Sequence, residues 1–143
     1  MQGNEKATPG VYVHPGFLMA NIVNPIVKFL GGPMLTVRGR RSGVSIKTPL
    51  APFTHQGVRY LVSGGGETQW VRNLRAAGQG QLRVGRSHED FRAVELEGVE
   101  RDQIVAAYRD HMGRRAQRYF VALPELSDHP VFRVEPIDRL DPQ

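Results

Sequence analysis

Two short glycine-flanked stretches carry the residues best suited to bind an anion or a flat ligand. The first is GRRSG, residues 39–43, where Arg40, Arg41 and Ser42 can present two guanidinium groups and a hydroxyl to one anion. The second is SGGGET, residues 63–68, whose glycines let backbone N–H groups approach a ligand at the start of a predicted helix. Taken alone, a solvated basic turn and a tight glycine-rich turn are the simpler interpretations of these stretches.

The usual motifs of phosphate binding and nucleophilic catalysis are missing from the sequence. In VSGGGETQWVRNL, residues 62–74, Gln69 stands where the third glycine of a dinucleotide fingerprint would fall. There is no Walker-type Gly-Lys-Ser/Thr sequence and no Gly-x-Ser-x-Gly elbow. The chain has no cysteine, and its 5 histidines are scattered, so we expect no metal site. Any catalysis should therefore depend on a bound organic cofactor.

The composition is typical of one soluble globular domain. The chain has 143 residues, of which 40% are apolar, and a formal net charge of +5. Most basic residues are arginines, which favours an anionic ligand or simply reflects codon usage. Because the arginines are spread along the chain and aromatic residues are few, we expect no nucleic-acid partner. The polar N-terminus lacks a secretory signal, which favours a cytoplasmic location.

The first part of the chain is expected to be a loose arm, residues 1–14, followed by a single domain over residues 15–143. Leu18, Ile22, Ile26 and Phe29 fall near one face of a helix that Pro25 would kink. We expect this helix to pack on the domain. The alternatives are a weak membrane-surface contact through residues 15–30, hence a membrane-associated protein, or a cover over a ligand groove.

From Met34 onward the apolar period changes from that of a helix to that of a strand. Tight turns between consecutive strands indicate antiparallel pairing, so the expected fold is mainly β or α+β, a small barrel of about six strands with packed helices. Pro49 and Pro52 should place the second strand at an edge or give it a bulge. The HED sequence, residues 88–90, is interpreted as a hairpin turn. Strands are expected over residues 34–40, 45–55, 58–63, 80–86, 88–98 and 129–137, and helices over residues 67–77, 101–112 and part of 114–124.

The arginine-rich and glycine-rich stretches, taken with their spacing, resemble one known family. The segment LTVRGRRSG…TPLAPF…VRYLVSGGGETQWVRNLRAAG is similar to the deazaflavin-dependent nitroreductases, whose members use coenzyme F420. The resemblance covers roughly residues 35–96, with a looser match in HPVFRVEPI at residues 129–137. It implies a split β-barrel like that of FMN-binding oxidoreductases.

The resemblance also implies roles for particular residues. The basic turn would hold the phosphate-bearing tail of the cofactor, the glycine-rich loop would lie against the deazaflavin ring, and the helix over residues 70–74 would close that side. Trp70 could instead belong to the core, which we favour. Many relatives carry a basic residue where this chain has only glycines. The residues expected to bind the cofactor are Arg40, Arg41, Ser42, Gly43, Lys47, Ser63, Gly64, Gly65, Gly66, Trp70 and Asn73.

The implied activity is hydride transfer from reduced F420 to an electron-poor small molecule such as a quinone, an enone or a nitro compound. Tyr60, Tyr108 and Tyr119, or solvent, are the candidate proton donors. One alternative keeps the fold and changes the cofactor to FMN, whose phosphate could also use the arginines. Another is a non-catalytic protein that binds F420 or a fatty acid. An exposed barrel edge would suit a homodimer.

Overall fold

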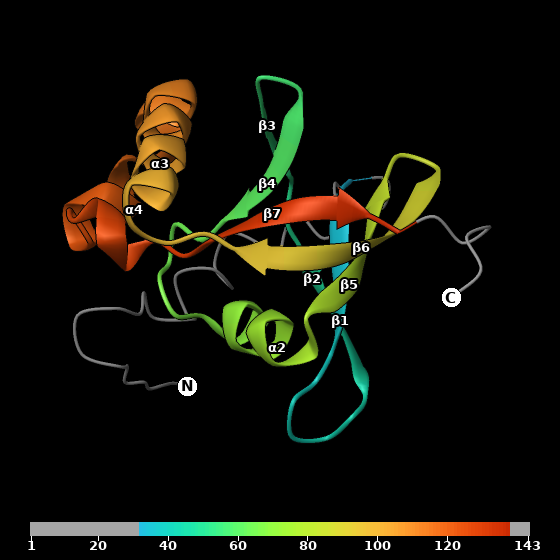
Figure 1. Cartoon of the computed structure of the whole chain (residues 1–143). Helices are drawn as coiled ribbons and strands as arrows, with labels where there is room; N and C mark the ends of the chain where they lie inside the picture. The colour runs from blue at the N-terminus through green and yellow to red at the C-terminus, as the bar shows by residue number, and fades with distance from the viewer. Residues whose placement is uncertain (1–31, 138–143) are drawn as a thin grey trace.

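Seven antiparallel strands form one sheet in the computed structural model of the chain, which describes residues 32–137 (Figure 1). The expected arm, the expected helix of residues 15–29 and the membrane contact assigned to residues 15–30 lie outside the described residues. The strands are β1 (Met34–Arg38), β2 (Ser45–Pro49), β3 (Phe53–His55), β4 (Val58–Val62), β5 (Gln79–Val84), β6 (Ser87–Glu95) and β7 (Val131–Pro136). The helices are α2 (Gln69–Ala77), α3 (Gly98–Met112) and α4 (Gln117–Ala122), with 3₁₀ turns η2 (Gly113–Ala116) and η3 (Leu126–Asp128).

The strand order β2-β1-β5-β6-β7-β4-β3 places two hairpins at opposite ends of the curled sheet. The expected single strand over residues 45–55 is wrong, because the segment between Pro49 and Phe53 leaves the sheet at one edge and re-enters at the other. Proline cannot donate a ladder hydrogen bond, which explains the interruption at this point. The split raises the number of strands from the expected six to seven, and it leaves β2 and β3 both at an edge, as the prolines predicted.

The hairpin turns depend on residues with positive φ. Gln56 and Gly57, at φ 51° and 80°, join β3 to β4 in a tight turn, between the strand ranges 45–55 and 58–63 expected from the sequence. The interpretation of residues 88–90 as a turn is wrong, since His88 pairs with Arg83 inside the β5–β6 ladder. The turn lies slightly earlier, where Gly85 adopts φ 62°, a conformation that favours glycine.

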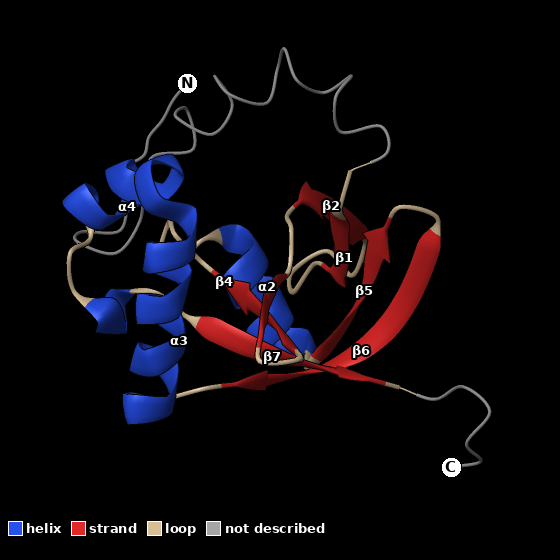
Figure 2. Ribbon diagram, turned by 90° about the horizontal axis from the view of Figure 1, so that it is seen from above, coloured by secondary structure: helices blue, strands red, loops and turns tan. Residues whose placement is uncertain are grey.

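Two clusters of buried side chains hold the domain together. The first lies between α2 and the curled sheet, where Val71 and Leu74 of the helix pack with strand residues such as Leu35, Leu82 and Phe91. The second lies between the sheet and the α3–α4 side, with Phe53 and Val105 among its members. Figure 2 shows α3 and α4 together at one end of the sheet, whereas α2 lies beneath its centre. None of the helices within residues 32–137 is long and apolar enough to cross a membrane.

Candidate functional site

The arginine turn, residues 39–43, joins β1 to β2 and is held by its own hydrogen bonds. The Gly39 N–H donates to the Val44 carbonyl at 2.8 Å, and the Gly43 N–H donates to the Gly39 carbonyl at 2.9 Å. The Ser42 hydroxyl accepts from the Val44 N–H at 3.1 Å. Gly43 has φ 76°, which favours glycine at this position. The turn therefore presents the side chains of Arg40 and Arg41 from a fixed backbone.

Helix α2 holds one of these arginines in place. The Asn73 side-chain oxygen accepts from the Arg40 backbone N–H at 3.1 Å and from its guanidinium at 2.8 Å. The same guanidinium nitrogen donates to the Gln69 Oε1 at 3.0 Å. Gln69 and Asn73 are four residues apart on the helix, so they share one face. Asn73 is only 4% exposed, which makes its contact with Arg40 part of the packing between α2 and β1.

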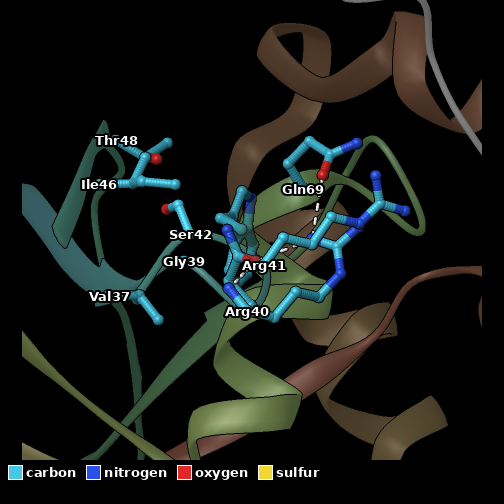
Figure 3. A pocket seen from close by; sticks show the side chains of 10 residues that line it. Val37, Gly39, Arg40, Arg41, Ser42, Ile46, Thr48 and Gln69 are labelled. Atoms are coloured by element: carbon cyan, nitrogen blue, oxygen red, sulfur yellow. Dashed lines mark hydrogen bonds between the residues drawn. The ribbon is translucent and has the colours of Figure 1, made fainter. Parts of the chain in front are cut away.

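A cavity of about 320 Å³ opens between the arginine turn and the first turns of α2. Figure 3 shows the strand residues Val37, Ile46 and Thr48 on one side of it and the arginines with Gln69 on the other. Its charged lining residues are all arginines, so the cavity suits a ligand with phosphate or carboxylate groups. The lining residues are Val37, Gly39, Arg40, Arg41, Ser42, Ile46, Thr48, Gln69, Trp70 and Asn73.

Trp70 packs against the core, as favoured from the sequence, and also lines the cavity. Its ring lies 6.1 Å from that of Phe132, centroid to centroid, and it packs against the core beneath the sheet. It also lines the cavity beside the arginine turn. The indole therefore joins the core to the cavity wall, where an aromatic surface is available to a ligand.

Six of the predicted cofactor residues do not line this cavity: Gly43, Lys47 and the four residues of the glycine loop, 63–66. Gly43 lines a second cavity of about 430 Å³, which the arginine turn shares with Arg38 and the end of α2. Lys47 is exposed on β2 between Ile46 and Thr48, so its side chain points to the face opposite theirs. It lines neither cavity.

The glycine loop, residues 63–66, is buried and closed on itself. The Ser63 hydroxyl donates to the Gly66 carbonyl at 2.6 Å, and the Ser63 N–H donates to the Pro130 carbonyl at 2.9 Å. The Tyr119 ring covers Gly64 so closely that a Cβ at this position would lie 2.8 Å from Tyr119 Cδ2. The expected flat surface for a cofactor ring is thus occupied at Gly64 by an α4 side chain, so a ring at this position requires Tyr119 to move.

Thr68, next to this loop, carries a buried hydroxyl that is available to a ligand. It precedes α2 at the N-cap position but makes no side-chain cap hydrogen bond. Its hydroxyl is buried, with the residue 6% exposed, and it has no hydrogen-bond partner within residues 32–137. An unpaired buried hydroxyl costs roughly 1–3 kcal/mol. A polar ligand group at the start of α2 would remove this cost, which fits a cofactor whose ring lies against the glycine loop.

The three candidate proton donors gather on the α3–α4 side. Tyr60 and Tyr108 pack against the second buried cluster, and Tyr119 reaches the glycine loop. Burial raises the pKa of Tyr108 above 10.0, and the nearby Tyr119 raises it further. Burial likewise raises the pKa of Tyr119, against the opposing charge of Arg118. Both phenols therefore keep their protons at neutral pH and can donate them.

The structure thus divides the predicted residues into two groups, and of the tyrosines Tyr119 is the one seen against the glycine loop. One is the arginine turn with α2, and the other is the tyrosine group. Sequence reasoning missed Gln69, although its spacing of four from Asn73 was a usable signal. It also missed Thr68 as an individual site residue, because burial without a partner has no signature in sequence. Within residues 32–137 no cluster of metal-ligating side chains is found.

The curled antiparallel sheet of seven strands with its packed helices defines the chain as a split-barrel protein. Within this class, the chain belongs to the F420H(2)-dependent quinone reductase family, whose sequence model matches residues 17–122. The match includes the arginine turn, the glycine loop, α2 and the candidate tyrosines. It confirms the F420-dependent family expected from the motifs, and its description names a quinone as acceptor. The protein is an F420-dependent oxidoreductase, and F420 is its cofactor.

Solved structures agree with this assignment. An F420-H2 dependent reductase, FDR-A, is 27% identical over 72% of this chain and 92% of its own, with a TM-score of 0.57. A structure described as a domain-swapped dimer is 23% identical over 85% of this chain and 99% of its own, at 0.58. An FAD-binding protein from Mesorhizobium loti is 15% identical over 78% of this chain and 87% of its own, with a TM-score of 0.51. The last two support the fold alone. None of the curated protein sequences compared with the chain matches it.

Proposed function

We propose that this protein reduces a quinone with reduced F420, and that enones and nitro compounds are further acceptors of the same electron-poor class. The bound cofactor supplies a hydride from its deazaflavin ring. The observation that carries the proposal is the arginine turn, because it lines one cavity with Trp70 and Asn73 of α2 inside the segment that matches the family. FMN is the alternative cofactor, since its phosphate would suit the same turn.

In this proposal the arginine turn binds the anionic tail. Arg41 is exposed and its guanidinium can pair with a phosphate or carboxylate through two parallel hydrogen bonds. Arg40 is already oriented by Asn73 and Gln69, so little side-chain entropy is lost when a ligand binds beside it. Gly43 and Lys47 would act only on a part of the tail that extends beyond the main cavity.

The glycine loop and the start of α2 bind the ring. The ring would lie against the backbone of the glycine loop once Tyr119 has moved away from Gly64, and the Thr68 hydroxyl offers a hydrogen bond to a polar edge of the ring. The partial positive charge at the N-terminus of α2 favours negative charge that develops there during reduction. This geometry orients the ring without the basic residue that many relatives carry in the loop.

A tyrosine donates the proton that the reduced acceptor takes up. Tyr119 is the leading donor because it lies directly against Gly64, and Tyr108 is near enough for Tyr119 to raise its pKa. Burial keeps both phenols protonated, so either can donate to an acceptor oxygen after hydride transfer. Tyr60 packs against the same buried cluster and would shape the acceptor side.

The substitution Thr68→Val tests the proposed position of the ring. Valine has the shape of threonine without the hydroxyl, so the protein should be as stable as wild type or more stable, because an unpaired polar group is removed. F420 affinity should fall by about tenfold if the hydroxyl bonds the cofactor. Thr54→Val, on the exposed face of β3, is the matched control. Unchanged affinity in Thr68→Val would move the ring away from the start of α2.

We further infer a homodimer and a cytoplasmic location. Within residues 32–137, β2 and β3 are the edge strands of the sheet, and Ile46 on β2 is 44% exposed, which suits pairing with a second copy. The structural likeness to a domain-swapped dimer supports the same idea. Light scattering coupled to size exclusion tests it directly: a dimer mass supports the homodimer, and a monomer mass at micromolar concentration contradicts it. The weak membrane-surface contact of residues 15–30 stays a prediction.

A further inference from the structure

His129 is a buried histidine that none of the roles above uses. It lies just before β7, beyond the segment that matches the family, and its side chain is 0% exposed. Its Nδ1 is 3.0 Å from the Ser63 carbonyl oxygen, and its Nε2 is 2.7 Å from the Leu123 carbonyl oxygen. The ring also packs on Phe120 of α4, at 4.4 Å between centroids. One side chain therefore joins two backbone segments that are far apart in sequence.

The chemistry of this contact is unusual, because both partners can only accept hydrogen bonds. A neutral imidazole has one N–H and so donates to one of the two carbonyls, whereas the doubly protonated ring donates to both. A buried carbonyl left without a donor costs free energy. The two ring nitrogens thus face different carbonyls: Nδ1 faces that of Ser63, which also accepts from the Gly66 N–H at 3.4 Å, and Nε2 faces that of Leu123.

The two carbonyls lie on either side of the contact between Gly64 and Tyr119. Ser63 opens the glycine loop, and Leu123 ends α4, where its N–H donates to the Tyr119 carbonyl at 2.8 Å. The residue after His129 holds the loop as well, since Pro130 accepts from the Ser63 N–H. His129 thus fixes the loop and the helix that carries Tyr119 relative to each other.

We propose that His129 is a positioning residue that sets the spacing between the glycine loop and Tyr119 through its two ring nitrogens. It touches neither cofactor nor acceptor. Its Nδ1 contact with Ser63 holds the surface for the cofactor ring, and its Nε2 contact with Leu123 holds the tyrosine that donates the proton. The assignment of these effects to binding and turnover rests on the proposed function, whereas the two backbone contacts do not.

Two substitutions test the Nδ1 and Nε2 contacts of His129 one at a time. The side-chain amide of Asn can take the place of Nδ1–H, and that of Gln can take the place of Nε2–H. His129→Asn should therefore keep F420 affinity within about threefold of wild type and lose roughly tenfold in kcat with a quinone acceptor. His129→Gln should show the reverse, with F420 affinity about tenfold weaker and kcat at saturating cofactor nearly unchanged. His129→Leu should lose both.

The experiment compares F420 binding, kcat and KM for a soluble naphthoquinone, and thermal stability for the three variants and wild type. Equal losses of affinity and turnover in the Asn and Gln variants, in proportion to their loss of stability, would show a merely structural role and overturn the proposal. If His129→Leu does not fold, the Asn and Gln pair still decides the outcome.

Amide hydrogen exchange on the ligand-free protein gives a readout that does not depend on F420. Exchange should speed up at the α4 end, including the Leu123 N–H, in His129→Asn, and in the glycine loop in His129→Gln. If this split is found but wild type binds no F420, the positioning role holds and the proposed function fails. If F420 binds but both segments loosen equally in both variants, the positioning role fails and the proposed function holds.

Discussion

Asn73 accepts two hydrogen bonds from Arg40 through one oxygen atom, from the backbone N–H at 3.1 Å and from the guanidinium at 2.8 Å. This pair ties the turn between β1 and β2 to the middle of α2. The arginine turn is thus positioned before any ligand arrives. An anion-binding residue that is already oriented loses less entropy on binding.

Replacing Asn73 should weaken both the fold and the site. In Asn73→Ala the Arg40 N–H and guanidinium lose a buried acceptor, so we expect about 1–3 kcal/mol less stability and weaker F420 binding. Gln69→Ala removes only the more exposed contact to the guanidinium, so it should cost clearly less in both measurements. Urea unfolding and F420 titration check the prediction. Equal effects of the two substitutions would contradict a special role for Asn73.

Arg41 should contribute affinity without contributing stability. It is exposed and lines the cavity, so Arg41→Ala should bind F420 roughly 10–100-fold more weakly while unfolding at the same urea concentration. Binding should also depend less on salt than in wild type, because one charge contact is gone. Arg86→Ala is the matched control, because Arg86 is an exposed arginine in the β5–β6 turn. This turn lies near Met34, at the start of β1, whereas the arginine turn follows the other end of β1. A loss as large in the control would mean a nonspecific charge effect.

The contact between Gly64 and Tyr119 can be measured with a double-mutant cycle. The added Cβ in Gly64→Ala would lie 2.8 Å from Tyr119 Cδ2 and 2.9 Å from its Cγ, so the ring has to move. In a Tyr119→Ala background this clash is absent. We therefore expect Gly64→Ala to cost about 1 kcal/mol or more in wild type and clearly less in Tyr119→Ala. Additive costs would show that the two residues do not contact each other in solution.

The reaction rate should fall at alkaline pH because Tyr119 loses its proton there. Its raised pKa means that the folded protein holds this proton to higher pH than free tyrosine, whose pKa is 10.0. A rate that needs the protonated phenol should stay level through neutral pH and fall only above pH 10, as the phenol ionises. Tyr119→Phe should lose about tenfold or more in kcat and lose this alkaline fall with it.

Tyr60→Phe is the comparison for Tyr119→Phe, because Tyr60 lies on β4 and packs against the second buried cluster, whereas Tyr119 lies against Gly64. A pH profile that keeps its alkaline limb in Tyr119→Phe would assign the proton to another group, with Tyr108 the next to test.

The sequence was most informative where local chemistry decides the structure. The hairpin at Gln56 and Gly57, the helix cap at Gly78 and the alternation of β1 were all predictable, because each depends on neighbouring residues. The arginine turn was predictable for the same reason. The separation of β2 from β3 was not, because a proline indicates an interruption without showing which edge the next strand will join.

The rest of the site depends on contacts between distant segments. Arg40 meets Asn73 across 33 residues, and His129 meets Ser63 across 66. The placement of Tyr119 over Gly64 likewise follows from how α4 packs, not from any local pattern. The glycines of residues 64–66 were predicted to form a surface for a cofactor ring, and in the structure Gly64 lies against Tyr119 of this chain.

The most direct test of the account is a titration of the purified protein with F420, followed by the fluorescence of Trp70, the only tryptophan and part of the cavity wall. We predict saturable binding at micromolar F420, weaker binding in Arg41→Ala, and no comparable binding of FMN. The absence of F420 binding at micromolar concentration, or a purified protein that is yellow with bound FMN, would contradict the central claim.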